Sequence, residues 1–352
     1  MRAAVLTEYG EPLSIRSLDA PSPTPEGVVV RVEACGICRS DWHAWQGHGE
    51  WADDRVPRGQ ILGHEPAGTV VEVGDRVRRY EVGDRVAVPF NLGDGSCSRC
   101  LSGHGNRCAD GHALGFESAA PGAFAERVHV PRADYNLLAL PDGVDPVDVA
   151  ALGCRFMTAY HALAHRVSPS PGSWVAVHGC GGVGLSAVAI ARAAGHRAIA
   201  VDIRAEALAL AREVGAAVTL DASERDVVDA IRERTGDGAD VSLDALGRAE
   251  TCRNSVRCVR PGGTHVQVGL TTDAERGEVS LPTDWMTRWE VSFVGSRGMP
   301  PTRYDELFGL VERGAVDPAH LVTREVTLED VSERLAAMTD YTTVGVEVVT
   351  EF

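Results

Sequence analysis

The sequence contains no lysine, and all 34 of its basic residues are arginine. Chemistry that uses a lysine Schiff base and phosphate binding by a P-loop lysine are therefore excluded. The 34 positive charges are outnumbered by 50 acidic residues, which gives a formal net charge of −16. A protein with this charge does not bind nucleic acid or an anionic membrane through a general basic surface.

Long apolar runs are missing as well. No segment approaches the roughly 18 apolar residues of a membrane-spanning helix, and residues 1–8 contain no apolar signal core. The nine cysteines are too few in 352 residues for a disulfide scaffold. We therefore expect a soluble cytoplasmic protein without nucleic-acid or membrane partners, in which clustered cysteines indicate metal binding.

The pattern of expected strands and helices changes twice along the chain. Its length suggests two domains, because single cores rarely grow beyond about 250–300 residues. Short strands predominate before residue 150, whereas strands and helices alternate over 173–268. After residue 291 we expect helices over 304–312 and 328–338 and a last strand over 344–350. This order predicts an α/β protein in which a doubly wound parallel sheet is inserted into a β-rich unit.

Residues 179–184, Gly-Cys-Gly-Gly-Val-Gly, fit the dinucleotide-binding pattern G-x-G-x-x-G between an expected strand and an expected helix. The first glycine makes the turn, the second admits the pyrophosphate to the backbone, and the third lets helix and strand pack closely. The helix N-terminus then faces the phosphates. The alternative interpretation is a glycine-rich turn without a ligand. The expected contacts are Gly179, Gly181, Gly182, Val183, Gly184, Asp202, Ile203 and Arg204.

Asp202 ends the next expected strand, close to the usual spacing of about 20 residues after the motif. Its carboxylate would accept hydrogen bonds from the ribose hydroxyls and would repel a 2′-phosphate. The sequence therefore predicts NAD rather than NADP, although Arg204 weakens that preference.

A second cluster follows the spacing of a tetrahedral structural zinc loop and consists of Asp94, Cys97, Cys100 and Cys108. The segment from Asp94 to Cys108 has little apolar content and cannot form a hydrophobic core of its own. A carboxylate is an acceptable zinc ligand, so we predict a structural zinc site of three cysteines and Asp94. His104 is the alternative fourth ligand, and a metal-free lobe with reduced thiols is the remaining alternative.

Three other segments carry scattered cysteine and histidine residues: 35–43 (Cys-Gly-Ile-Cys-Arg-Ser-Asp-Trp-His), 63–65 (Gly-His-Glu) and 153–158 (Gly-Cys-Arg-Phe-Met-Thr). With the cysteine loop and the glycine motif in this order, the sequence resembles the zinc-dependent medium-chain alcohol dehydrogenases over essentially its whole length. It looks closest to the bacterial members. The resemblance implies a GroES-like catalytic domain over 1–154, completed by 293–352, and a Rossmann domain over 155–292. It also implies a homo-oligomer, with a tetramer favoured over a dimer.

The resemblance further implies roles for matching residues. Cys38, His64 and Cys154 would bind a catalytic zinc ion whose fourth position stays open. Four residues would support the reaction: Ser40 bonds the alcohol, Asp41 orients His64, His43 is the distal base of a proton relay, and Glu65 approaches the metal when the fourth position is vacated.

Cofactor and substrate contacts follow in the same way. Arg39 would contact the pyrophosphate, Thr158 would lie beside the nicotinamide, and Val268, Gly269 and Leu270 would contact its carboxamide. The expected pocket residues are Phe90, Trp42 and Trp285.

The implied activity is a zinc-dependent oxidoreductase that interconverts alcohols with aldehydes or ketones. The hydride would pass from a zinc-bound alkoxide to NAD. The alternatives are a polyol or amino-alcohol dehydrogenase, or a lyase or epimerase without net redox change on the same scaffold. The joint presence of Cys38, His64 and Cys154 argues against a zinc-free reductase.

Overall fold

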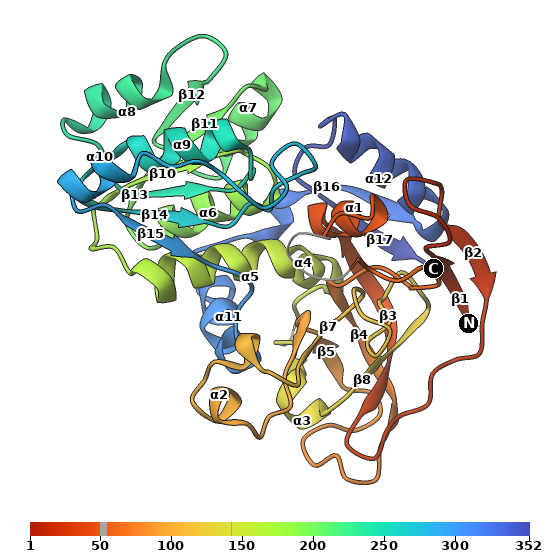
Figure 1. Ribbon diagram of the computed structural model, residues 1–352. Helices are drawn as coiled ribbons and strands as arrows, with labels where there is room; N and C mark the ends of the chain where they lie inside the picture. The colour runs from red at the N-terminus through yellow and green to blue at the C-terminus, as the bar shows by residue number, and fades with distance from the viewer. Residues whose placement is uncertain (50–54, 142) are drawn as a thin grey trace. The chain divides into compact units, whose positions relative to one another are not determined.

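The computed structural model describes residues 1–49, 55–141 and 143–352 (Figure 1). Its contacts divide the chain into two compact units. Unit 1 contains residues 1–157 and 298–352, and unit 2 contains residues 158–297. None of the helices in the described ranges is both long and apolar enough to cross a membrane.

Unit 1 is built around a mixed sheet in the order β16-β17-β3-β4-β5-β9, with β8 also paired to β3. The last strand, β17, runs antiparallel to β3, so the C-terminal segment completes the sheet that the N-terminal half begins. Two small two-stranded sheets, β1-β2 and β6-β7, accompany it.

The strands of unit 1 are β1 (Arg2–Val5), β2 (Ser14–Ser17), β3 (Val28–Ile37), β4 (Pro66–Val73), β5 (Arg85–Ala87), β6 (Asn91–Leu92), β7 (His112–Ala113), β8 (Arg127–Val130), β9 (Leu138–Ala139), β16 (Val322–Thr327) and β17 (Val346–Glu351). Its helices are α1 (Arg39–Trp45), α2 (Ser98–Leu101), α3 (Ala133–Asn136), α4 (Pro146–Ala151), α11 (Tyr304–Glu312) and α12 (Val331–Thr339). Helix α5 (Cys154–Tyr160) contains the boundary between the units and continues as a π-helix over His161–Val167.

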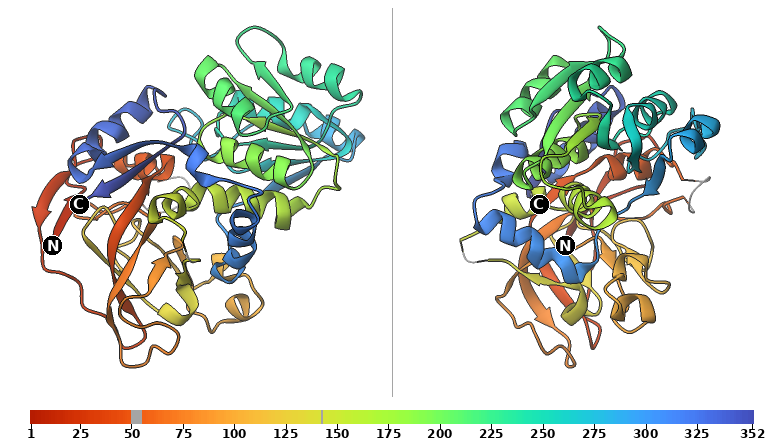
Figure 2. Two further views of the ribbon diagram at one scale, coloured as in Figure 1. Left: turned by 180° about the vertical axis from the view of Figure 1, so that it is seen from behind. Right: turned by 90° about the vertical axis from the view of Figure 1, so that its left-hand side faces the viewer.

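Unit 2 contains a six-stranded sheet in the order β12-β11-β10-β13-β14-β15, in which all pairs are parallel. Helices cover both faces of this sheet (Figure 1, Figure 2). The doubly wound parallel sheet predicted from the alternating elements is therefore confirmed. Buried apolar side chains such as Ile199, Leu220 and Ile231 form a core cluster under the helices.

The strands of unit 2 are β10 (Trp174–His178), β11 (Arg197–Asp202), β12 (Val218–Asp221), β13 (Ala239–Asp244), β14 (Val259–Gln267) and β15 (Ser292–Gly295). Its helices are α6 (Gly182–Ala193), α7 (Ala205–Glu213), α8 (Val227–Thr235), α9 (Ala249–Arg257) and α10 (Thr283–Arg288). Strand β15 was not expected from the sequence. It pairs with β14, and unit 2 accordingly extends to Arg297 rather than to residue 292.

Candidate metal and nucleotide sites

The first candidate site lies where β3 ends and β4 begins. These strands are antiparallel, and their register pairs Cys35 with Pro66. Cys38 directly follows β3 and His64 lies two residues before β4, so the two residues lie at neighbouring strand ends. Helix α4 packs on β3 and β4, and the chain leaves it directly into Cys154. The three expected ligands are thus brought together by strand pairing and by one helix packed on the sheet.

The ligand atoms of Cys38, His64, Glu65 and Cys154 all lie within 4.8 Å of one another, and all four residues are buried. The hydrogen bond with Cys154 holds the pKa of Cys38 well below its ordinary value, with His64 acting in the same direction against the effect of burial. A thiol with a low pKa readily supplies the thiolate that binds metals.

Asp41 orients the imidazole of His64. Its Oδ1 lies 2.8 Å from His64 Nδ1 and accepts the backbone N–H of Gly63, while Oδ2 accepts the N–H of Cys38. Because Nδ1 donates to Asp41, the lone pair of the imidazole lies on Nε2. His64 Nε2 is buried and has no hydrogen-bond partner among the described residues. Two thiols and this orphaned nitrogen suit a zinc ion with one open position.

Glu65 is held by a residue that the sequence argument missed. Arg155 Nη2 lies 2.5 Å from Glu65 Oε2, Arg155 Nε donates to Oε1, and Arg155 Nη1 donates to the carbonyl of Ile37. Burial raises the pKa of Glu65 to about 7, although Arg155 opposes that rise. A Cβ at Gly36 would collide with both side chains of this pair. No local sequence signal identifies Arg155 as the partner of Glu65, because 90 residues separate the two.

Ser40 and His43 lie on α1 beside the cluster. Cys38 Sγ is 3.8 Å from Ser40 Oγ, and His43 Nδ1 is 3.1 Å from His48 Nδ1. Burial lowers the pKa of His43 to about 3, and the positive charges of Arg39 and His48 add to the shift. His43 is therefore neutral at physiological pH.

The aromatic candidates differ in their surroundings. Phe90 lies edge-on to His64 with ring centroids 5.6 Å apart, and Phe116, which the motifs did not single out, lies 4.8 Å from the same imidazole. Trp42 is buried, donates its Nε1–H to Thr339 Oγ1 and carries the Arg39 guanidinium 3.7 Å from its ring centroid. Its contacts therefore place it in the packing between α1 and α12.

Arg39 is expected at a pyrophosphate. In the structure its guanidinium lies between the rings of Trp42 and Tyr341 and donates to the carbonyl of Met338. This packing restricts the side chain of Arg39.

The cysteine loop forms a second cluster in unit 1. The ligand atoms of Asp94, Cys97, Cys100 and Cys108 lie within 4.8 Å of one another. Asp94 Oδ1 accepts the backbone N–H groups of Ser96 and Cys97, and these bonds lower its pKa. His104, the alternative fourth ligand, is exposed and does not belong to the cluster. Asp94 is thus the group that the fold places beside the three sulfurs.

The glycine motif connects β10 with α6 in unit 2. Gly179 has φ +91°, a conformation that favours glycine in the turn. A Cβ at Gly184 would collide with the carbonyl of Gly179, so only glycine allows the helix to approach the strand this closely. A Cβ at Gly181, the residue before α6, would meet no described atom within 4 Å. Open space at the start of α6, where backbone N–H groups converge, fits a bound pyrophosphate. Gly182 and Val183 form the first turn of the helix.

Asp202 ends β11 next to this loop. Its Oδ2 accepts the N–H of Cys180, and its Oδ1 accepts the N–H groups of Ile203 and Arg204. Arg204 Nε lies 3.5 Å from the same carboxylate, which places a positive charge beside the predicted ribose ligand. The side chain of Ile203 is 67% exposed.

The ends of β13 and β14 complete the carboxyl edge of the sheet. Val268 and Gly269 follow β14 and both donate their N–H groups to the carbonyl of Asp244. Leu270, although apolar, is 55% exposed at this edge. Thr158 Oγ1 is buried, and the part of the chain that the structure describes offers it no hydrogen-bond partner. The exposed side chain of Leu270 and the buried hydroxyl of Thr158 therefore both suit contacts to a ligand.

Trp285, which the sequence places in the substrate pocket, lies away from the glycine loop. It lies on α10, which directly precedes the first residue of β15, and its ring is 5.9 Å from the guanidinium of Arg232 near the end of α8. The carbonyl of the nearby Trp289 accepts the N–H of Gly262, close to the start of β14. These contacts place α10 at the edge where the strands begin, opposite the glycine loop. Ligands of open parallel sheets bind at the carboxyl ends of the strands.

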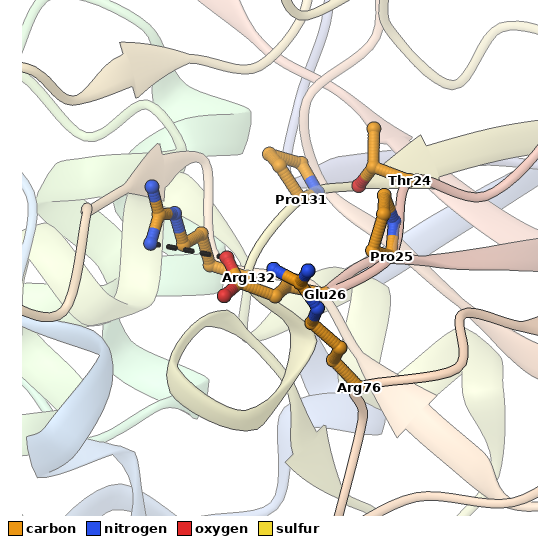
Figure 3. Close-up of a pocket in the computed structure, with 6 residues that line it drawn as sticks. All are labelled: Thr24, Pro25, Glu26, Arg76, Pro131 and Arg132. Atoms are coloured by element: carbon orange, nitrogen blue, oxygen red, sulfur yellow. Dashed lines mark ion pairs between the residues drawn. The ribbon is translucent and has the colours of Figure 1, made fainter.

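A pocket in unit 1 is lined by Thr24, Pro25, Glu26, Arg76, Pro131 and Arg132 (Figure 3). Arg132 and Glu26 form an ion pair there at 3.1 Å. Its lining contains none of the residues singled out from the sequence.

The chain matches two family models and is similar to several known proteins. Residues 24–142 match the alcohol dehydrogenase GroES-like domain, and residues 182–313 match the zinc-binding dehydrogenase domain. An NAD-dependent alcohol dehydrogenase of Sulfurisphaera tokodaii is 35% identical over 99% of each chain. A sorbitol dehydrogenase of Bacillus subtilis is 34% identical over 95% of this chain and 92% of its own. The solved structure of the alcohol dehydrogenase TADH from Thermus sp. ATN1 covers 100% of both chains with a TM-score of 0.90 and 28% identity.

Proposed function

The chain belongs to the zinc-dependent medium-chain alcohol dehydrogenases, as its motifs predict, and on this premise we propose that it interconverts alcohols with aldehydes or ketones using zinc and NAD. The observation that carries the proposal is the convergence of Cys38, His64 and Cys154 around the orphaned Nε2 of His64.

Cys38, His64 and Cys154 would hold the catalytic zinc. When bound there, zinc supplies a Lewis acid that polarises the oxygen of the alcohol or carbonyl substrate. Asp41 keeps His64 in the tautomer that has its lone pair on Nε2. Arg155 holds Glu65 in a buried ion pair, which leaves the two sulfurs and the imidazole as the ligands. The cysteine loop, with Asp94, Cys97, Cys100 and Cys108, would hold a second, structural zinc ion.

Substrate and proton are handled by residues of α1 and by two aromatic rings. Ser40 Oγ would hydrogen-bond the substrate hydroxyl, and the neutral imidazole of His43 would take up the proton. Phe90 and Phe116, which flank His64, would form apolar walls and exclude water from the reacting carbon.

The nucleotide would bind at the carboxyl edge of the parallel sheet. NAD supplies the acceptor for the hydride. The N-terminus of α6 would bind the pyrophosphate, Asp202 the ribose, and residues 268–270 the nicotinamide. Arg39 would add a phosphate contact and Thr158 a contact beside the nicotinamide. The carboxylate of Asp202 favours NAD over NADP by repelling a 2′-phosphate, and the adjacent Arg204 reduces that preference.

The proposed partners are a small alcohol or carbonyl substrate and further copies of the chain. Strand β15 ends the sheet order of unit 2, and Phe293 on it is 41% exposed. An apolar edge strand of this kind is a surface that subunits bury. The predicted tetramer stays a prediction.

The test is to measure zinc per chain by mass spectrometry and to follow absorbance at 340 nm with an alcohol panel and either NAD or NADP. We expect bound zinc and net formation of NADH, with NAD preferred. A polyol dehydrogenase, which the sorbitol dehydrogenase relative favours, would respond only to the polyols of the panel. Turnover of substrate without net NADH would instead indicate a lyase or epimerase.

We expect His43→Ala to slow alcohol oxidation by about tenfold at pH 6 and by less at pH 9. The pKa of His43 is lowered to about 3, so its imidazole is neutral over this whole range and can carry the proton only transiently on its way to solvent. Without it, the proton must pass to hydroxide, whose concentration falls tenfold per pH unit towards acid. The measurement is kcat at saturating alcohol between pH 6 and 9.

His320→Ala is the matched control, because the side chain of His320 is 72% exposed and its Nδ1 lies 3.1 Å from the carboxylate of Asp317, three residues away. Its pH profile should follow that of the unchanged protein. An identical profile for His43→Ala would exclude the relay role of His43.

A further inference from the structure

The last residues of three neighbouring strands form a row across the carboxyl edge of the unit 2 sheet. His178 ends β10, Asp244 ends β13 and Gln267 ends β14. In the strand register His178 pairs with Asp244, and Asp244 pairs with Gln267. The two loops that follow β13 and β14 therefore begin side by side.

Asp244 binds the backbone of both loops. Its Oδ1 accepts the N–H groups of Leu246 and Gly247 at 3.0 and 3.2 Å. Its main-chain carbonyl accepts those of Val268 and Gly269 at 3.1 and 2.8 Å. Asp244 is fully buried, so none of these bonds competes directly with bulk water. One carboxylate residue thus fixes the start of both loops.

Gln267 ties the two loops to each other. Its Nε2 donates to Asp244 Oδ2 and to the carbonyl of Gly269, both at 2.9 Å. Its Oε1 lies 3.1 Å from His265 Nε2. Both N–H groups of the amide are used, and its oxygen receives a third bond. The orientation of the amide follows from these partners, because a flipped amide would place its oxygen against two acceptors.

The partner of Gln267 is itself fixed by a buried network. Ser255 Oγ lies 2.8 Å from His265 Nδ1, and Ser242 Oγ lies 2.6 Å from Ser255 Oγ. Burial lowers the pKa of His265 to about 4, so the ring is neutral and carries one proton. With Ser255 donating to Nδ1, that proton lies on Nε2 and points to Gln267 Oε1.

The two loops also touch backbone to backbone. A Cβ at Gly269 would collide with the N–H of Gly247, and a Cβ at Gly247 would collide with the carbonyl of Leu270. Gly247 has φ +87°, which other residues rarely adopt. The backbones of the two loops are thus in close contact. A substitution at Asp244 or Gln267 that moves one loop therefore also moves residues 268–270.

We propose that Asp244 and Gln267 are positioning residues that hold residues 268–270 against the nicotinamide end of the dinucleotide. This inference rests on the proposed function. In it, the pair makes no contact with the cofactor and acts through the backbone of the 268–270 loop. The adenosine and pyrophosphate contacts come from other strand ends, at the glycine loop after β10 and at Asp202 on β11. The pair should therefore affect one half of the cofactor only.

The test compares two ligands on the full-length protein by isothermal titration calorimetry: NADH, and ADP-ribose, which lacks the nicotinamide. Gln267→Leu is expected to raise the Kd for NADH by about tenfold, because it removes the half-buried hydrogen bonds of its amide to Asp244 and Gly269. The Kd for ADP-ribose should stay within about twofold, since its contacts are untouched.

Asp244→Asn is a second, isosteric variant. Its amide oxygen can still accept the N–H groups of Leu246 and Gly247, but its NH2 group then faces the NH2 group of Gln267. We expect the same selective loss for NADH. Thr235→Val is the matched control, because it removes a half-buried hydroxyl that accepts the N–H of Gly238 just before β13, at the edge where the strands begin. It should lower the melting temperature and leave the ratio of the two Kd values unchanged.

The two ligands distinguish a positioning role of Asp244 and Gln267 from a purely structural role. Equal weakening of NADH and ADP-ribose by Gln267→Leu and Asp244→Asn would show that the pair only supports the fold, and would overturn the proposal. Unchanged binding of both ligands would overturn it as well. Failure of the unchanged protein to bind either ligand would contradict the proposed dinucleotide function itself.

Discussion

His64→Ala is expected to remove the catalytic zinc and to lower kcat by about a thousandfold or more, because loss of a Lewis acid worth several kcal/mol costs tenfold per 1.36 kcal/mol. The expected loss is large because the imidazole is the one nitrogen ligand in the cluster. The shortened side chain would leave two sulfurs and a carboxylate that Arg155 already neutralises.

The measurement combines zinc per chain by mass spectrometry with kcat for alcohol oxidation. NADH binding should be largely preserved, since the glycine loop and Asp202 belong to unit 2. Cys97→Ser is the matched control. It removes one ligand of the other cluster and should lower zinc content and thermal stability without a comparable loss of kcat per folded molecule. Full activity of His64→Ala, or of metal-stripped protein, would contradict the assignment of the catalytic site.

Arg155→Met is expected to destabilise the protein by about 3–5 kcal/mol, because it leaves the carboxylate of Glu65 buried without its counter-ion. The side chains of Glu65 and Arg155 are 0% and 5% exposed, so water cannot replace the lost partner. Removal of the guanidinium also leaves the carbonyl of Ile37 without its donor. The melting temperature should fall by roughly 10 °C, which is measured by circular dichroism.

Two controls identify the cause of this loss. Adding Glu65→Gln to Arg155→Met removes the buried charge as well and should recover part of the melting temperature. Arg58→Met breaks a surface ion pair with Glu8, in which both side chains are more than half exposed, and should change stability by about 1 kcal/mol or less. If Arg155→Met were no more harmful than Arg58→Met, the buried ion pair would contribute nothing to stability.

Much of the candidate site was predictable because its residue types are chemically unusual in sequence. Three spaced cysteines after Asp94, and a glycine motif between a strand and a helix, each point to a ligand. Helix α11 occurs over the predicted range, Tyr304–Glu312, because its apolar spacing is regular. Strand β15 escaped prediction because it is short and its residues are mostly exposed, so it lacks the buried alternation that identifies a strand.

The remaining site residues were not predictable because their roles depend on partners far away in the chain. Arg155 and Glu65 are separated by 90 residues, and Gln267 and Asp244 by 23. Neither pair follows a local pattern. Trp285 had the residue type of a pocket wall, yet the direction of the parallel strands places its helix at the opposite edge from the glycine loop.

The sequence alone determined the family, the order of the two kinds of unit and the chemical groups available for zinc and a dinucleotide. The family follows from the resemblance of its motifs, whereas the order of the units and the available chemical groups follow from local spacing and periodicity. Only the tertiary structure decided which buried charges neutralise one another and which loop backbones are tied together. Strand pairing and helix packing determine those contacts, and they bring together residues whose positions in the chain carry no mutual signal.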